Sequence, residues 1–406
     1  MATPIESSIC ARPACTRGLL LAAAFALSAC SVADNLSYDE IVAELDGIVT
    51  ISGEGADRAI VYAENAPTSA WYMRMFWLLP IRAPLGWLFG VRHSGPIENP
   101  SGHVRDLLTE LPDELDSDEV RCAQAVLRFG WIAELDANGN SRVVAFDGLV
   151  AAAERMGTAV FPPGFAEVLP ATEGPDLAAL RATVQAGRPE GRGGRMLSAD
   201  EREAYRAALA GLVARPLSDW SHRLLLVQDL VEIVRAEGEG DLALVCRDAL
   251  RTAVASCVRG VLTRSIVSRD PRLVEVRLCA MEHVRRLGGP EVVPWLLLVM
   301  SATPEQMARG EPRYDPSPLV QLRLVRYCGQ LQGVLAEREL VLPGRDNWQS
   351  LTPVDFLAQT ILNDEGFYAR LRVPAMAALT LSLGRPTFDP DPAWVREWFR
   401  ERRRRA

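Results

Sequence analysis

The sequence contains no lysine, since all 44 of its basic residues are arginine. This absence excludes chemistry that depends on a side-chain amine. A Walker A phosphate loop needs a lysine that reaches the phosphates, a Schiff base forms on a lysine, and Ser-Lys nucleophile pairs use lysine as the base. Three common kinds of catalytic site are therefore ruled out for this chain of 406 residues.

Histidine and motif-bearing cysteine are also scarce. The four His residues are far apart in the sequence, and none of the eight Cys residues forms a C-x-x-C motif. We find no G-x-S-x-G elbow, no H-E-x-x-H and no dinucleotide-binding loop after a predicted strand. We therefore expect no metal, no cofactor and no enzymatic activity. The thiols after the leader occupy apolar helical positions, as small buried hydrophobes do: Cys122, Cys246, Cys257, Cys279 and Cys328.

The chain lacks an excess of positive charge. Its net charge is −8, and without residues 1–29, which carry Arg12, Arg17 and Glu6, it is −9. Because nucleic-acid affinity is dominated by basic contacts to phosphate, a nucleic acid is not an expected partner. Hydrophobic residues make up 49% of the chain, which is enough to build two or three cores or one elongated array.

Residues 18–31, GLLLAAAFALSACS, follow Arg12 and Arg17 and contain nine consecutive apolar residues. This run is too short for a bilayer, which needs about 20 residues, and is typical of a signal peptide. Its ending, Leu27-Ser28-Ala29-Cys30, resembles the lipobox of bacterial lipoproteins. The resemblance implies cleavage after residue 29, diacylation of Cys30, and a lipid-anchored location in the cell envelope. Ser31 favours the outer over the inner membrane; an ordinary cleaved signal or an uncleaved anchor is the alternative.

The following region, residues 30–103, contains the apolar aromatic segment 71–90, WYMRMFWLLPIRAPLGWLFG. Three interpretations are open: a spanning helix, a segment in the membrane interface, or a buried hairpin. Two arginines and two prolines disfavour the spanning helix, whereas aromatic rings and arginines suit the headgroup layer. The candidate interface residues are Trp71, Tyr72, Arg74, Phe76, Trp77, Arg82, Trp87 and Phe89.

From residue 104 the pattern is helix after helix, which predicts an all-α protein. Residues 104–240 form a helical region in which the Gly- and Arg-rich stretch 185–198 reads as a linker or loop. Within it, residues 136–147 have the ligand spacing of part of a calcium loop, although the expected glycine and final glutamate are missing. The alternative there is an ordinary helix-helix turn. The calcium candidates are Asp136, Asn138, Asn140 and Asp147.

Residues 241–406 contain an internal repeat, followed by an Arg-rich C-terminal tail. The stretch DPRLVEVRLCAMEHVRRLGGPEVVPWLLLV, residues 270–299, predicts a helix that is stopped by Gly288-Gly289 and a second helix opened by Pro290. Related text begins at Asp315 and Asp364. Alignment on Arg277, Arg323 and Arg372 gives periods of 46 and 49 residues, which are typical of helical-pair solenoids.

The segment VRLCAMEHVRRLGGPEVVPWLLL, residues 276–298, resembles a HEAT repeat. Together with the related text around it, the resemblance covers roughly residues 262–385. The resemblance implies an α-solenoid of stacked helical pairs in which a turn Asp and a second-helix Arg interact along the stack. The matching positions are Asp270 with Arg277, Asp315 with Arg323, and Asp364 with Arg372. A non-repetitive helical bundle is the alternative.

These features predict a lipid-anchored scaffold, with the bilayer bound through acylated Cys30 and an unknown envelope protein bound by the repeat array. The alternative is an enzyme or small-ligand-binding protein whose site lies in residues 91–200. That part of the chain lies outside the repeat resemblance.

Overall fold

The computed structural model describes residues 37–53, 58–63, 100–158, 160–161, 177–214, 220–268, 270–301, 315–338, 352–363, 368–385, 388–389 and 391–405. The predicted signal peptide and lipid-attachment residue Cys30 lie outside the described residues. So do the aromatic segment 71–90, with all eight candidate interface residues, and Asp364.

The chain divides into two units. One consists of Met1–Thr50 and Val61–Glu114, and the other of Ile51–Ile60 and Leu115–Ala406. Among the described residues of the first unit, helices α2 (Tyr38–Ile48) and α5 (Pro100–Glu110) pack against each other. Strands β1 (Val49–Ser52) and β2 (Ala59–Tyr62) form a two-stranded sheet.

Helix α2 buries an apolar stripe along one side. Ile41, Leu45 and Ile48, spaced three to four residues apart, are all buried. Ser37 and Glu40 form a capping box at its start, because the Ser37 N–H donates to the Glu40 carboxylate at 3.0 Å. In the same unit, His103 Nε2 lies 2.6 Å from the buried Glu44 Oε1.

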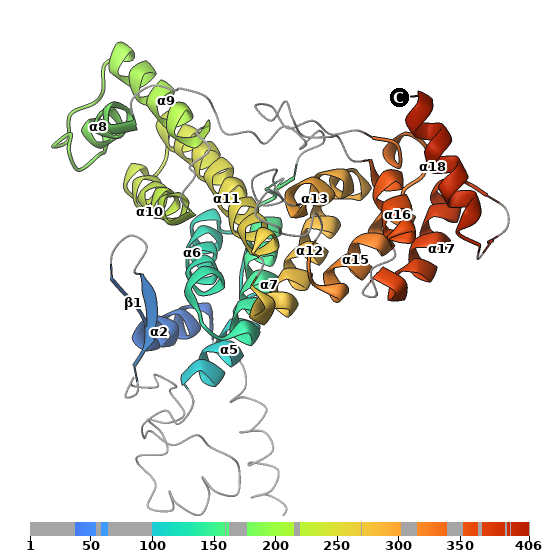
Figure 1. The fold of residues 1–406 in the computed structure, drawn as a ribbon. Helices are drawn as coiled ribbons and strands as arrows, with labels where there is room; N and C mark the ends of the chain where they lie inside the picture. The colour runs from blue at the N-terminus through green and yellow to red at the C-terminus, as the bar shows by residue number, and fades with distance from the viewer. Residues whose placement is uncertain are drawn as a thin grey trace, which may run out of the picture. The chain divides into compact units, whose positions relative to one another are not determined.

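From Leu115 onward, the regular secondary structure described in the second unit is helical (Figure 1). Its α-helices are α6 (Glu119–Leu135), α7 (Gly139–Arg155), α8 (Leu177–Gly187), α9 (Ala199–Ala214), α10 (Trp220–Glu237), α11 (Asp241–Val267), α12 (Val274–Gly288), α13 (Val293–Met300), α15 (Pro318–Gly329), α16 (Pro353–Leu362), α17 (Arg372–Ser382) and α18 (Ala393–Arg405). Short 3-10 turns are η3 (Pro271–Leu273), η4 (Pro290–Val292), η5 (Gly333–Leu335) and η6 (Tyr368–Arg370).

Most of these helices form two rows. In row A, each of α6, α11, α13, α16 and α18 contacts the next; in row B, each of α7, α12, α15 and α17 does the same. Row A helices also pack against the row B helices that follow them, which defines the pairs α6–α7, α11–α12, α13–α15 and α16–α17. Helices α8, α9 and α10 lie between the first two pairs in sequence, and α9 and α10 both contact α11.

Local sequence signals explain where several helices begin. The Asp118 carboxylate accepts hydrogen bonds from the Val120 and Arg121 N–H groups at the start of α6. Asp270 caps η3 in the same way, directly before Pro271, and η3 runs into α12. Thr352 accepts from the Asp355 N–H, so that a hydroxyl cap and a proline open α16.

The structure confirms the all-α prediction, with the β1–β2 pair as its exception among the described residues. None of the helices in the described ranges combines the length and the apolarity that crossing a bilayer requires. The expected boundary between residues 240 and 241 falls between α10 and α11, which pack against each other.

The arginines of the predicted linker or loop 185–198 form ion pairs with helices α9 and α10. Arg188 Nη2 lies 3.1 Å from Asp229 Oδ1 of α10, and Arg192 pairs with Glu237 at the end of α10, where both side chains are 9% exposed. Arg195 pairs with Glu201 in the first turn of α9. The prediction of a linker or loop did not anticipate these contacts, because the acidic partners on α10 are about 40 residues away in the sequence.

Candidate functional site

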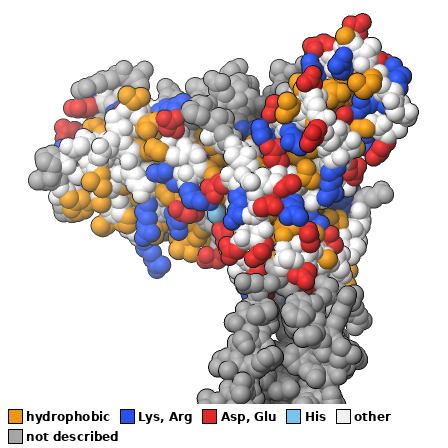
Figure 2. All heavy atoms as spheres, turned by 180° about the vertical axis from the view of Figure 1, so that it is seen from behind, with side chains coloured by type: hydrophobic (Ala, Val, Ile, Leu, Met, Phe, Trp, Pro, Cys, Tyr) orange, Lys and Arg blue, Asp and Glu red, His pale blue; other side chains and the backbone are white. Residues whose placement is uncertain are grey.

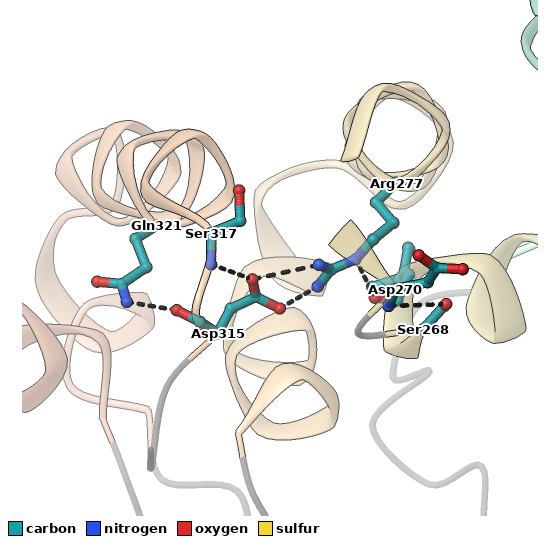
Figure 3. Close-up of polar contacts among 7 residues, drawn as sticks. Ser268, Asp270, Arg277, Asp315, Ser317 and Gln321 are labelled. Carbon is teal, nitrogen blue, oxygen red and sulfur yellow. Dashed lines mark hydrogen bonds and ion pairs between the residues drawn. The ribbon is translucent and has the colours of Figure 1, made fainter. Parts of the chain in front are cut away.

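A buried ion pair joins the second helical pair to the third (Figure 3). Arg277 of α12 and Asp315, just before α15, are each only 1% exposed. Arg277 Nη1 donates to Asp315 Oδ1 at 3.2 Å, and Nη2 donates to Oδ2. This bidentate geometry is the one that a planar guanidinium and a carboxylate favour.

Backbone groups complete the network around this pair. Arg277 Nε donates at 3.2 Å to the carbonyl oxygen of Ile266, which is in the last turn of α11 and has no partner within that helix. Asp315 Oδ1 also accepts from the Ser317 N–H at 2.9 Å, and the Gln321 amide donates to the Asp315 carbonyl oxygen. One arginine thus links the end of α11 to the start of α15.

Helix α17 repeats this arrangement. Arg372 Nε donates at 3.2 Å to the carbonyl oxygen of Ile361, eleven residues earlier, as Arg277 does to Ile266. In both pairs the carbonyl belongs to the last turn of the row A helix. A cation at this end also interacts favourably with the helix dipole.

The three row B helices α12, α15 and α17 share one register. Each is followed by a glycine with positive φ: Gly289 at 63° directly after α12, Gly333 at 56° in η5 after α15, and Gly384 at 62° shortly after α17. Only glycine adopts this left-handed conformation without a steric penalty. The residue twelve positions earlier is Arg277, Gln321 or Arg372. The equivalent apolar positions are buried in all three: Val276, Val320, Leu371; Ala280, Leu324, Ala375; Met281, Val325, Met376; Val284, Cys328, Leu379.

Two of the three predicted Asp–Arg pairs, Asp270 with Arg277 and Asp315 with Arg323, do not form, whereas Asp364 of the third pair lies outside the described residues. Asp270 pairs with Arg272 at 2.8 Å, whereas the partner of Arg277 is Asp315 of the next pair. Gln321 occupies the position equivalent to Arg277, which makes the repeat spacing 44 and then 51 residues instead of 46 and 49. Arg323 lies two residues further on, is partly exposed, and contacts Glu282 of α12 at 2.6 Å.

The calcium candidates do not surround a common point. Asp136 Oδ1 accepts from the Asn138 N–H, and the Asn138 side chain caps α7 by accepting from the Asn140 N–H. Helix α7 begins at Gly139, so that Asn140 and Asp147 lie within the helix and not in a loop that could wrap an ion. Here the helix-helix turn, the alternative interpretation, is the structure that forms.

Asp147 instead lies at the junction of α7 with α12. His283 Nε2 of α12 is 2.8 Å from Asp147 Oδ1, and the Cys279 thiol is close to both. The three potential ligand atoms all lie within 4.8 Å of one another. A second polar contact, Arg286 Nη1 with Glu154 Oε1 at 3.2 Å, joins the same two helices.

Burial determines the pKa values of the described cysteines. Cys122, Cys246, Cys257 and Cys328 are buried free thiols, as expected of small hydrophobes. Loss of hydration raises the pKa of Cys257 to about 12 and that of Cys122 to about 11. Cys279 differs because it is only partly buried and is adjacent to Asp147 and His283. Burial, assisted by the Asp147 charge, raises its pKa to about 12.

Sequence reasoning missed the cluster of Asp147, Cys279 and His283. A local signal existed, since Cys279 and His283 are four residues apart on one predicted helix and therefore share a face. Asp147 is 132 residues before Cys279, and only the packing of α7 on α12 brings the two together.

Comparisons with known proteins identify no relative: no family model, no curated protein and no solved structure matches this chain. The function is therefore inferred from the helical pairs, their junctions and their exposed side chains.

Proposed function

We propose that this chain is a HEAT-like α-solenoid that serves as a protein-binding scaffold in the bacterial cell envelope and is anchored there by a lipid on Cys30. The observation that carries the proposal is the repetition of one helical pair. Helices α12, α15 and α17 bury equivalent positions and are each followed by a glycine with positive φ, while the row A helices contact one another along the second unit. Stacked helical pairs characteristically bind other proteins along extended surfaces.

Exposed apolar side chains support a protein partner. Val373 and Leu381, eight residues apart on α17, are 62% and 58% exposed, and Leu319 of α15 is 51% exposed. Residues spaced by eight positions lie on one side of a helix. Aliphatic side chains at such positions bury their area only when another molecule covers them.

The surface charge also favours a protein over a polyanion. On the face shown in Figure 2, acidic and arginine side chains are interspersed across the described surface, with hydrophobic side chains between them. A polyanion would be held by a concentrated basic patch, which agrees poorly with a net charge of −8.

The anchor is supported by the sequence before residue 31. An apolar stretch followed by Leu-Ser-Ala-Cys is the signal that directs diacylation in bacterial lipoproteins. Two acyl chains hold a protein stably at a membrane, because each buried methylene contributes about 0.8 kcal/mol.

The scaffold is tested by cross-linking in cells that express the full chain. We expect one envelope protein to be recovered in stoichiometric amount, and to be lost with the double variant Val373→Glu/Leu381→Glu. The matched control is Leu244→Glu/Val267→Glu, which introduces the same two charges at exposed positions of α11 and should leave recovery unchanged. If the α17 variant recovers as much of the envelope protein as the control variant does, α17 is not the binding surface.

The anchor is tested separately by mass spectrometry of the mature N-terminus. A diacylated Cys30 as the first residue is the expected result, whereas an uncleaved or unmodified N-terminus contradicts it. Thermal stabilisation by a small metabolite, with no protein partner recovered, would favour the alternative of a ligand-binding protein or enzyme with its site in residues 91–200.

A further inference from the structure

The junction between α7 and α12 brings together three side chains of the kinds that bind transition metals. Asp147 comes from α7, and Cys279 and His283 come from one face of α12. A carboxylate, a thiolate and an imidazole are each established ligands of zinc. Their donor atoms already lie within 4.8 Å of one another, and the closest pair, His283 Nε2 and Asp147 Oδ1, is 2.8 Å apart.

This geometry is close to that of a tetrahedral zinc site. With zinc at about 2.3 Å from sulfur and about 2.0–2.2 Å from nitrogen and oxygen, donor atoms are separated by about 3.3–3.6 Å. The His-Asp contact would lengthen by about half an ångström and the thiol would approach by roughly an ångström at most. The Asp147 side chain has room for such a shift because it is 63% exposed, and Cys279 is only partly buried.

The environment of His283 also suits a ligand. The residue is 8% exposed, and α12 holds its ring against α7. Its other ring nitrogen, Nδ1, has no hydrogen-bond partner among the described residues. Nε2, which faces Asp147, is therefore the ring nitrogen in position to bind an ion.

We propose that Asp147, Cys279 and His283 bind one Zn²⁺ ion that bridges α7 and α12, with a water molecule as the fourth ligand. The exposed carboxylate of Asp147 leaves one side of the cluster open to solvent, which is where that water would bind. On binding, the Cys279 thiol releases its proton to solvent and the ion takes its place. The ion would link the pair α6–α7 to the pair α11–α12.

The site is tested with the full chain, purified in detergent without a polyhistidine tag, using metal ions alone as probes. Calorimetric titration with Zn²⁺ should show one strong site. Titration with Co²⁺ should produce thiolate-to-cobalt charge-transfer absorption in the near ultraviolet, which reports a sulfur ligand directly. Zn²⁺ should also raise the temperature of unfolding.

Two variants and a control identify the ligands. Cys279→Ser should abolish the charge-transfer absorption and weaken zinc binding more than about 100-fold, since losing a direct ligand should cost more than losing a supporting hydrogen bond. Asp147→Asn, at a surface position that does not threaten folding, should weaken binding at least about 10-fold. Glu154→Gln removes the neighbouring α7–α12 contact to Arg286 and should leave zinc affinity unchanged.

Absence of a strong zinc site in the unmodified chain would overturn the proposal. So would charge-transfer absorption that survives in Cys279→Ser, because the bound ion would then belong to another thiol of the chain.

Discussion

The buried pair of Arg277 and Asp315 gives a sharp test of how the helical pairs are joined. Replacement of Arg277 by Met removes the guanidinium but keeps most of the side-chain volume. It leaves the Asp315 carboxylate, 1% exposed, without its counter-charge. Because a lone charge in such a place has lost its hydration, we expect the free energy of unfolding to fall by about 3–5 kcal/mol.

A second substitution should recover much of this loss. In Arg277→Met/Asp315→Asn the remaining amide is neutral, and its oxygen can still accept a hydrogen bond from the N–H of Ser317, the residue directly before α15. We expect the double variant to be more stable than Arg277→Met alone, since the penalty comes mainly from an unpaired charge and less from loss of the attraction. The matched control is Arg323→Met, which breaks a partly exposed contact with Glu282 and should cost about 1 kcal/mol or less.

The assay is urea unfolding followed by circular dichroism, together with hydrogen exchange measured by mass spectrometry. Each helical pair packs mainly on its neighbours, so that the loss should appear first as faster exchange in α12 and α15. If Arg277→Met costs no more than Arg323→Met, the pair does not hold this junction together. If the double variant is no more stable than the single one, the unpaired charge is not the cause of the loss.

Three further predictions follow from local geometry. Gly329→Ala should destabilise the protein by about 1–3 kcal/mol, because its Cβ would lie 2.7 Å from the Ala378 Cβ where α15 packs on α17. In Gly289→Ala the new Cβ meets no atom within 4 Å, so that the φ of 63° alone should cost about 1–2 kcal/mol. Equal urea midpoints for the wild type and both variants would contradict this. Hydrogen bonds from the Arg272 side chain and backbone lower the pKa of Asp270 from 3.8 to about 2, so the stabilisation from this ionised carboxyl is complete well above pH 3.8 and is lost as the pH falls through about 2. NMR titration should show the Asp270 pKa rising towards 3.8 in Arg272→Ala, and an unchanged value would refute the assigned cause. Burial raises the pKa of Cys122 and of Cys257, so both thiols should react with Ellman's reagent only as the chain unfolds, and rapid labelling of the native protein at either position, mapped by mass spectrometry, would show the burial to be incorrect.

Much of the helical architecture could be predicted because its signals are local. The caps Asp118, Asp270 and Thr352 lie within three residues of the N–H groups that they accept from. The stop at Gly289 follows from a conformation that glycine alone adopts easily. These signals need no knowledge of distant residues, and they sufficed to predict the all-α class.

The repeat register was harder to read because it depends on burial. Arg323 and Gln321 both lie near the start of α15, and matching of residue types selected the arginine. The structure places Gln321 inside, against the Asp315 carbonyl, and leaves Arg323 partly exposed. Position relative to the positive-φ glycine that follows each helix, and not chemical likeness, defines the equivalence.

The sequence by itself determined the helices, their ends and the apolar stripes that each must cover, because these depend on residues within a few positions of one another. Only the tertiary structure decided which distant side chains meet. Arg277 pairs with Asp315, which is 38 residues away in the sequence, and His283 contacts Asp147, which is 136 residues away. The physical reason is that an apolar stripe specifies that it must be buried but not against which neighbour. The partners at a helix junction are fixed when the helices pack, and the polar contacts proposed to matter in this protein lie at such junctions.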